Sequence, residues 1–146
     1  MKKLIFLSLL LISCCAMAQN KPNNILDIFV GNWHANGSAF GSPATITMDW
    51  TPVLESRFYR LQYKIITMDK DSTQIVFEGI AYYKPLGENR FAATWFDTQG
   101  SIHPITASND TITLTSLWGT PETQQGKTTY KIINEYPHDI TSYTQG

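Results

Sequence analysis

Histidine is the residue type in this chain best suited to metal or proton chemistry, and it occurs as His34, His103 and His138. A protein zinc site brings several such ligands together, often at the spacing His-x-His or His-Glu-x-x-His. Neither spacing occurs here. Each histidine is therefore predicted to be solvated or hydrogen-bonded within the fold, and no metal site is predicted.

Patterns that support catalysis or nucleotide binding are also missing from the sequence. No Gly-x-Ser-x-Gly segment is present to hold a nucleophilic serine. The stretch FVGNWHANGSAFG has widely spaced glycines, no lysine directly after them and strand-like sequence downstream, so it does not fit a phosphate-binding loop. Asp97 lies at a predicted turn, where a carboxylate usually caps the backbone; pairing with a second carboxylate is the alternative. We predict no enzymatic activity and no cofactor.

Residues 1–18 have the pattern of a bacterial signal peptide. Lys2 and Lys3 precede an apolar run over 4–12, and Ala16-Met17-Ala18 has the small-x-small pattern that signal peptidase cuts. The run is shorter than the roughly 20 residues of a membrane-spanning helix. We therefore expect an exported protein, periplasmic or secreted. The alternative is a lipoprotein anchored through Cys14, because Leu11-Ile12-Ser13-Cys14 resembles a lipobox.

The remaining chain, residues 19–146, has the size of one domain. Both cysteines lie in the leader, so the mature chain is predicted to lack disulfides. Loss of Lys2 and Lys3 changes the formal net charge from −1 to −3, and this balance does not favour nucleic acid as a partner. Residues 19–24 are predicted to form a flexible arm, followed by a single domain over 25–146.

Apolar and polar residues alternate with a period of two through most of this domain. In ATITMDWT (44–51), Ala44, Ile46, Met48 and Trp50 share one predicted face and the polar residues share the other. Such alternation is typical of strands with one buried and one wetted face. The pattern predicts strands over 44–51, 55–68, 74–84, 90–97, 101–108, 111–118, 127–136 and 140–144.

A short helix is predicted over Ile25–Phe29, capped by Asn23 or Asn24 and ended by Gly31. Short turns separate the strands, so eight or nine sequential strands are predicted to pair as an antiparallel meander. Closure into a single up-and-down β-barrel would remove the exposed edges, and this is the fold we predict. An open sandwich is the alternative.

The segment DIFVGNWHANG places Gly31 and Trp33 as Gly-x-Trp directly after the predicted helix. This order resembles the start of the calycin superfamily, which includes the lipocalins and fatty-acid-binding proteins. The resemblance implies that the helix closes one barrel end. It also implies that Gly31 allows a sharp turn into the first strand and that Trp33 is a structural plug at the base.

A second segment, FEGIAYYKPLGENRFAATWFDTQG, is similar to the central hairpin of a bacterial family of uncharacterised, calycin-like proteins. Phe77-Glu78-Gly79, Trp95-Phe96-Asp97 and Gly100 carry this likeness, which extends over about 25–144. It implies a fold more than an activity. Such barrels usually finish with a strand that carries a basic residue, whereas this chain ends in DITSYTQG. The last strand is therefore expected to be shortened or missing, through imperfect closure or truncation.

The candidate ligand-binding residues are those predicted to line the barrel: Trp50, Tyr63, Phe77, Glu78, Trp95, His103, Trp118 and Tyr130. A barrel of this size either fills with side chains or holds one small ligand. Glu78 shares its strand face with apolar Val76, Ile80 and Tyr82, so it either faces the interior as part of a site or lies outside.

These residues predict non-enzymatic binding of a small hydrophobic molecule in the barrel. The alternative is a structural or protein-interaction role in the cell envelope with a filled barrel. Because some calycins bind haem through one histidine, the resemblance leaves haem held by His103 or His138 as a third hypothesis. Membrane association is expected only if Cys14 is lipidated.

Overall fold

The computed structural model describes residues 24–68, 71–132 and 140–145. The predicted leader over 1–18, nearly all of the arm over 19–24, and His138 lie outside the described residues. Within the described residues, no helix is long and apolar enough to cross a bilayer.

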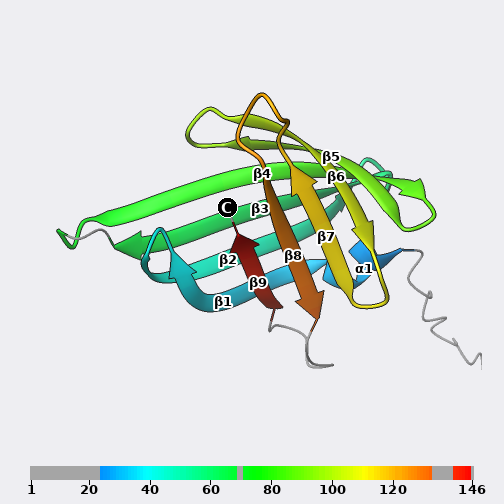
Figure 1. Cartoon of the computed structure of the whole chain (residues 1–146). Helices are drawn as coiled ribbons and strands as arrows, with labels where there is room; N and C mark the ends of the chain where they lie inside the picture. The colour runs from blue at the N-terminus through cyan, green and yellow to red at the C-terminus, as the bar shows by residue number, and fades with distance from the viewer. Residues whose placement is uncertain (1–23, 69–70, 133–139, 146) are drawn as a thin grey trace, which may run out of the picture.

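One short helix precedes a single antiparallel sheet with the strand order β1-β2-β3-β4-β5-β6-β7-β8-β9 (Figure 1). The elements are α1 (Ile25–Phe29), β1 (Gly31–Ala39), β2 (Ser42–Val53), β3 (Phe58–Met68), β4 (Gln74–Gly87), β5 (Arg90–Asp97), β6 (Ile102–Asn109), β7 (Thr113–Trp118), β8 (Gly126–Ile132) and β9 (Ile140–Gln145). The predicted antiparallel meander is confirmed. The sandwich alternative is wrong, because all the strands belong to one sheet.

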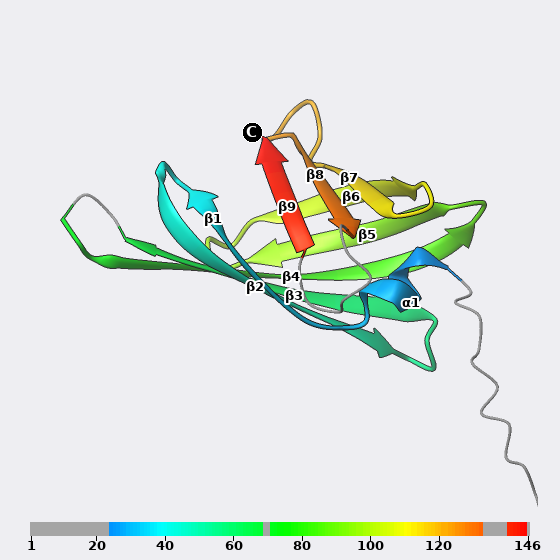
Figure 2. The ribbon, with the colours of Figure 1, turned by 90° about the horizontal axis from the view of Figure 1, so that it is seen from below.

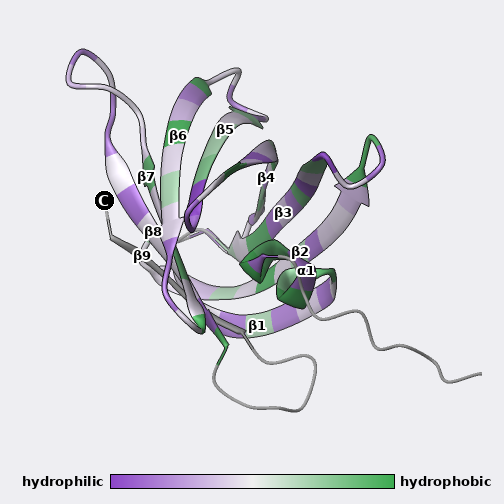
Figure 3. Ribbon diagram, turned by 90° about the vertical axis from the view of Figure 1, so that its right-hand side faces the viewer, coloured by the Kyte–Doolittle hydropathy of each residue, from purple (hydrophilic) through white to green (hydrophobic). Residues whose placement is uncertain are grey.

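The sheet curls into a half-barrel with a concave inner face, which is visible from below and along its length (Figures 2 and 3). β1 and β9 stand at the two ends of the strand order and approach each other. No ladder of paired residues joins them among the residues that the structure describes. A last strand is nevertheless present, because β9 pairs antiparallel with β8 from Lys127↔Gln145 to Ile132↔Ile140. Of the two expected outcomes, a shortened or a missing last strand, the structure has a short strand of six residues at the predicted position.

Helix α1 forms where its cap was predicted. The side chain of Asn24 accepts from the backbone N–H of Leu26 at 2.8 Å, and the carboxylate of Asp27 accepts from the N–H of Asn24 at 3.3 Å, which completes a capping box. The helix buries Ile25, Leu26 and Phe29 at one end of the half-barrel (Figure 3). The hydroxyl of Tyr59 on β3 donates to Asp27 and so ties the helix to the sheet.

The turn from α1 into β1 is made at Gly31, whose φ of 129° is a conformation that glycine adopts readily. Trp33 follows on the inner face and is 6% exposed. Its indole N–H donates to the carbonyl of Phe29 at 2.6 Å, and the two rings meet edge-on at 6.4 Å. The helix and the start of β1 therefore close one end of the half-barrel together.

The strand register brings inner-facing residues of successive strands into rows across the sheet. One row runs Trp33–Met48–Tyr63–Gly79–Asp97 over the first five strands. Its members come from segments far apart in the sequence, yet all of them lie on the same concave surface. This row links the plugged end of the sheet to the candidate site.

Candidate functional site

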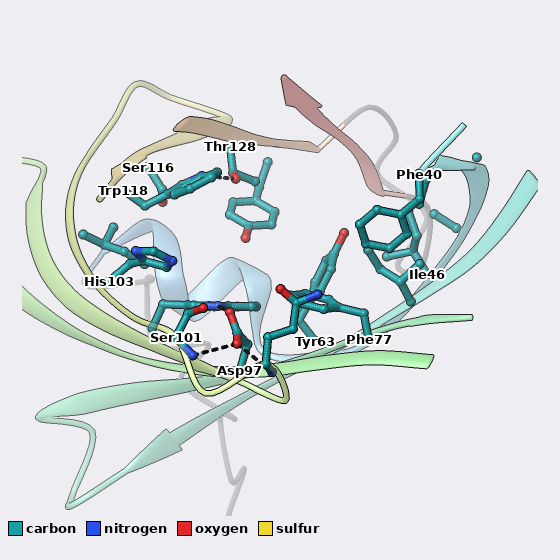
Figure 4. Close-up of a pocket in the computed structure, with 18 of the residues that line it drawn as sticks. Phe40, Ile46, Tyr63, Phe77, Asp97, Ser101, His103, Ser116, Trp118 and Thr128 are labelled. Atoms are coloured by element: carbon teal, nitrogen blue, oxygen red, sulfur yellow. Dashed lines mark hydrogen bonds between the residues drawn. The ribbon is translucent and has the colours of Figure 1, made fainter. Parts of the chain in front are cut away.

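A cavity of about 1020 Å³ lies on the concave face of the sheet (Figure 4). Its floor contains the buried residues Tyr83, Ser116 and Tyr130. Its rim carries exposed residues of the turns at the end away from α1, including Phe40, Gln99 and Gln124. Inner-facing side chains of β1 to β8 form the walls.

Trp95 is the centre of an aromatic cluster on one wall. Its indole stacks on Phe77 with ring centroids 6.2 Å apart, and Tyr63 meets it at 6.1 Å with the rings inclined by 66°. The ring lies over Gly79 of β4, where an added Cβ would be 1.9 Å from Cζ2 of the indole. The Phe-x-Gly and Trp-x-Asp patterns of the hairpin are therefore parts of one packed unit.

Trp118 on β7 has the same arrangement on the other side of the cavity. Its indole lies over Gly126 of β8, where a Cβ would be 2.1 Å from Cζ2. The indole N–H donates to the hydroxyl of Thr128 at 3.2 Å. In both walls, a glycine on the neighbouring strand makes the space that a tryptophan ring occupies.

Asp97 ends β5 at the rim of the cavity, and its carboxylate accepts three N–H donors. Oδ2 accepts from Nε1 of Trp95 at 3.0 Å, and Oδ1 accepts from the backbone N–H groups of Gln99 at 2.9 Å and Ser101 at 3.0 Å. Burial opposes the charged form, but these hydrogen bonds and the nearby His103 together lower the pKa of Asp97. The carboxylate is therefore ionised at neutral pH. It has the turn-capping role that the sequence indicated, and it also lines the cavity.

His103 lies on β6 directly opposite Trp95 in the β5–β6 register. Its ring is 5.5 Å from that of Trp118, with the planes inclined by 50°. Among the described residues, its buried Nδ1 has no hydrogen-bond partner. Figure 4 shows the imidazole on the cavity wall beside Trp118. The side chain is thus positioned by ring packing and not by internal hydrogen bonds.

The floor of the cavity is a buried phenol pair. The hydroxyl of Tyr83 lies 3.0 Å from that of Ser116, in hydrogen-bond contact. Burial raises the pKa of Tyr83 to about 12, although hydrogen bonds with Ser116 and Tyr130 act in the opposite direction. Burial also raises the pKa of Tyr130, and the nearby Tyr83 and Tyr63 add to this. Both phenols are therefore neutral over the physiological range.

Six of the predicted lining residues face this cavity: Tyr63, Phe77, Trp95, His103, Trp118 and Tyr130. Trp50 does not line it. The ring of Trp50 is 1% exposed and packs deeper, between Phe29 of the helix at 5.7 Å and Tyr83 at 5.1 Å. It belongs to the plug at the helix end.

Glu78 lies on the outer face of the sheet, so the idea that it faces the interior is wrong. Register pairs it with Lys64, and Nζ of Lys64 is 2.8 Å from Oε1 of Glu78, with both side chains about two-fifths exposed. Phe77 takes the inner position instead, opposite Ile65. The alternative placement of Glu78, outside the barrel, is the one that the structure has.

Several residues of the site were not singled out from the sequence. They are Ile46, Ile65, Tyr83, Ser101, Ser116 and Thr128, together with the two glycines that accommodate the tryptophans. Strand alternation could have identified Ile65 and Tyr83. Ile65 lies two residues after Tyr63 and Tyr83 four residues after Gly79, so each shares the inner face with its predecessor. The glycine contacts depend on strand pairing and had no local signal.

Comparison with protein-family models, curated proteins and solved structures finds no match to this chain. Nor do the described residues contain a group of three or more His, Cys, Asp or Glu side chains that could hold a metal ion.

Proposed function

We propose that this protein binds a small hydrophobic ligand, without catalysis, in the cavity of a calycin-like barrel. The observation that carries the proposal is the cavity of about 1020 Å³ walled by Tyr63, Phe77, Trp95 and Trp118. Small-molecule sites commonly have volumes of about 300–1,000 Å³ and mostly apolar and aromatic walls. Volume and lining both match that class of site.

The competing hypothesis is a filled barrel with a structural role. A filled interior interdigitates its side chains and leaves few voids larger than a water molecule. A hollow of this size next to a tightly packed plug supports a binding role more strongly than a structural one. The end of the half-barrel at α1 is packed with buried side chains, whereas the cavity opens toward the other end.

Export is part of the proposal. The leader pattern over 1–18 supports delivery to the periplasm or beyond, with Cys14 as the alternative point of lipid attachment. Fractionation of cells that express the wild type and Cys14→Ser distinguishes the two routes. We expect both proteins in the soluble exported fraction, and a membrane-bound wild type released by Cys14→Ser would show that it is a lipoprotein.

Binding is tested with N-phenyl-1-naphthylamine, a neutral hydrophobic dye whose emission rises in apolar surroundings, together with native mass spectrometry of freshly purified protein. Ala35 lines the cavity on β1, whereas Ala92 is exposed on the outer face of β5. We expect Ala35→Trp to weaken dye binding at least about tenfold by filling space, and Ala92→Trp to leave it unchanged. No dye binding and a bare mass, or equal loss in both variants, would overturn the proposal.

Haem is a less favoured occupant than a simpler hydrophobic molecule. His103 faces the cavity and could offer one axial ligand, but haem also carries two anionic propionates. No lysine or arginine occurs among the described residues that line the cavity. We expect haemin to show no shifted Soret band with this protein; a band that His103→Ala removes would identify haem as the ligand instead.

A further inference from the structure

The charges around the cavity have one sign. Among the described lining residues, Asp97 is the only carboxylate, and none is a lysine or arginine. The other titratable groups there are His34 on β1, His103 on β6 and the tyrosines. A ligand that enters therefore meets one fixed negative charge and no permanent positive one.

The negative charge remains available to a ligand. Among the residues that the structure describes, Oδ1 of Asp97 accepts two backbone N–H groups, whereas Oδ2 accepts only Nε1 of Trp95. A carboxylate oxygen offers about two lone-pair sites, so Oδ2 can accept one more donor. Because protein groups already hold the carboxylate in place, a ligand would not have to order it.

The aromatic rings beside Asp97 favour the same kind of ligand. The indole N–H of Trp95 donates to Asp97 at 3.0 Å, so an electron-rich indole and a carboxylate share one wall. Ring faces attract cations, and tryptophan does so most strongly. Carboxylate and indole thus act in the same direction on a positively charged group.

The opposite side of the cavity suits an apolar group. Figure 4 shows Phe40, Ile46 and Phe77 on one side and Asp97, Ser101, His103 and Trp118 on the other. Phe40, in the β1–β2 turn, meets Phe77 edge-on at 6.1 Å and is itself 63% exposed at the rim. One molecule spanning the cavity would meet aliphatic and aromatic carbon at one end and polar groups at the other.

From this arrangement we infer that the ligand is a hydrophobic amine, whose protonated nitrogen lies against Asp97 and Trp95 and whose apolar part lies against Phe40, Ile46 and Phe77. The inference rests on the proposed binding function and deepens it. A hydrophobic acid is disfavoured at the same site, because its carboxylate would face the Asp97 charge, and no lysine or arginine among the described lining residues offsets that repulsion.

Three molecules with the same chain and different head groups test the inference: decylamine, 1-decanol and decanoate, each competing with N-phenyl-1-naphthylamine near neutral pH. We expect decylamine to bind at least about tenfold more tightly than decanol, a difference of about 1.4 kcal/mol. Decanoate should bind at least about tenfold more weakly than decanol. Equal affinities for the three, or tightest binding of decanoate, would overturn the inference.

Asp97→Asn removes the charge directly but places an amide N–H against the Trp95 donor, so it risks misfolding. Gln99→Lys avoids this, because Gln99 is exposed on the rim and holds Asp97 only through its backbone N–H. The added ammonium should raise decanoate affinity at least about tenfold and lower decylamine affinity, whereas Gln99→Met should leave the ranking unchanged. An unchanged ranking in Gln99→Lys, with the dye still bound, overturns the charge preference alone. If the wild type binds neither the dye nor any of the three decyl compounds, the proposed function is overturned, and this inference falls with it.

Discussion

Replacing Gly79 with alanine perturbs the contact on which the Trp95 wall is built. The new Cβ would lie 1.9 Å from Cζ2 and 2.2 Å from Cη2 of the indole. Carbon atoms in contact are normally about 3.5–4.0 Å apart, so the ring must move by more than about 1.5 Å. Moving it disturbs the stacking on Phe77 and the hydrogen bond to Asp97.

The expected cost follows from two opposing effects. Overpacking a well-packed site costs about 1–3 kcal/mol. Replacing glycine by alanine in an ordinary backbone conformation raises the free energy of unfolding by about 0.4–1 kcal/mol, because it lowers the conformational entropy of the unfolded chain. We therefore expect Gly79→Ala to lower the free energy of unfolding by about 1–2 kcal/mol and to weaken binding of N-phenyl-1-naphthylamine.

Urea unfolding followed by far-ultraviolet circular dichroism measures this change without relying on tryptophan emission. Gly37→Ala is the matched control, because its Cβ would meet only Cδ1 of Ile46 at 3.9 Å, an ordinary contact. The control should be neutral or slightly stabilising. In a Trp95→Ala background, Gly79→Ala should cost almost nothing, since the clash is gone. Equal costs in the wild-type and Trp95→Ala backgrounds would show that a clash with the Trp95 ring is not the cause.

Three further predictions concern the floor, the outer face and the helix. Because burial raises the pKa of Tyr83 to about 12, above the roughly 10 of an unfolded chain, its stabilising contribution is complete below pH 10 and is lost between about pH 10 and 12. Unfolding free energies at pH 9 and 11 should therefore fall less steeply in Tyr83→Phe than in the wild type; equal slopes would contradict this. Glu78→Gln breaks an exposed pair with Lys64, so stability should change by less than about 1 kcal/mol and dye affinity not at all, which a titration beside the wild type checks. Asp27→Ala removes the capping box and the acceptor of Tyr59, and should cost about 1–3 kcal/mol in urea unfolding; Asp27→Asn should cost less.

Period-two alternation and turn signals located β2 to β9, because most of these strands have one wet and one buried face, whereas β1 was expected only from the calycin resemblance. Alternation placed Trp95 and Trp118 correctly on the inner face, and polar residues flanking Ile25–Phe29 predicted the cap of α1. Bounds shifted by a few residues where turns extend the ladders, as in β4, which continues to Gly87 through a register shift at Pro85. The predicted strand over 127–136 is confirmed to Ile132, and its remainder lies outside the described residues.

Alternation failed where both faces of a strand are apolar. In β4, one face carries Glu78 together with Val76, Ile80 and Tyr82, and the other carries Phe77 and Ala81. Because both faces are apolar, the pattern alone does not show which face is buried. Pairing with β3 decides the matter, because it sets Phe77 opposite Ile65 and Glu78 opposite Lys64. A cross-strand partner of opposite charge is a property of register, which no single segment contains.

The amino-acid pattern alone predicts an all-β meander, a capped helix at its start and a set of inward-facing aromatic residues. These features follow from local spacing and from the separation of polar and apolar faces. Three features became visible only in the folded chain: Trp50 belongs to the plug, Asp97 shares a wall with Trp95, and a cavity of about 1020 Å³ remains. The size of a cavity is the space enclosed by the curved sheet minus the volume of the side chains that fill it. Both quantities depend on how all the strands pack together, and no single segment of the sequence contains them.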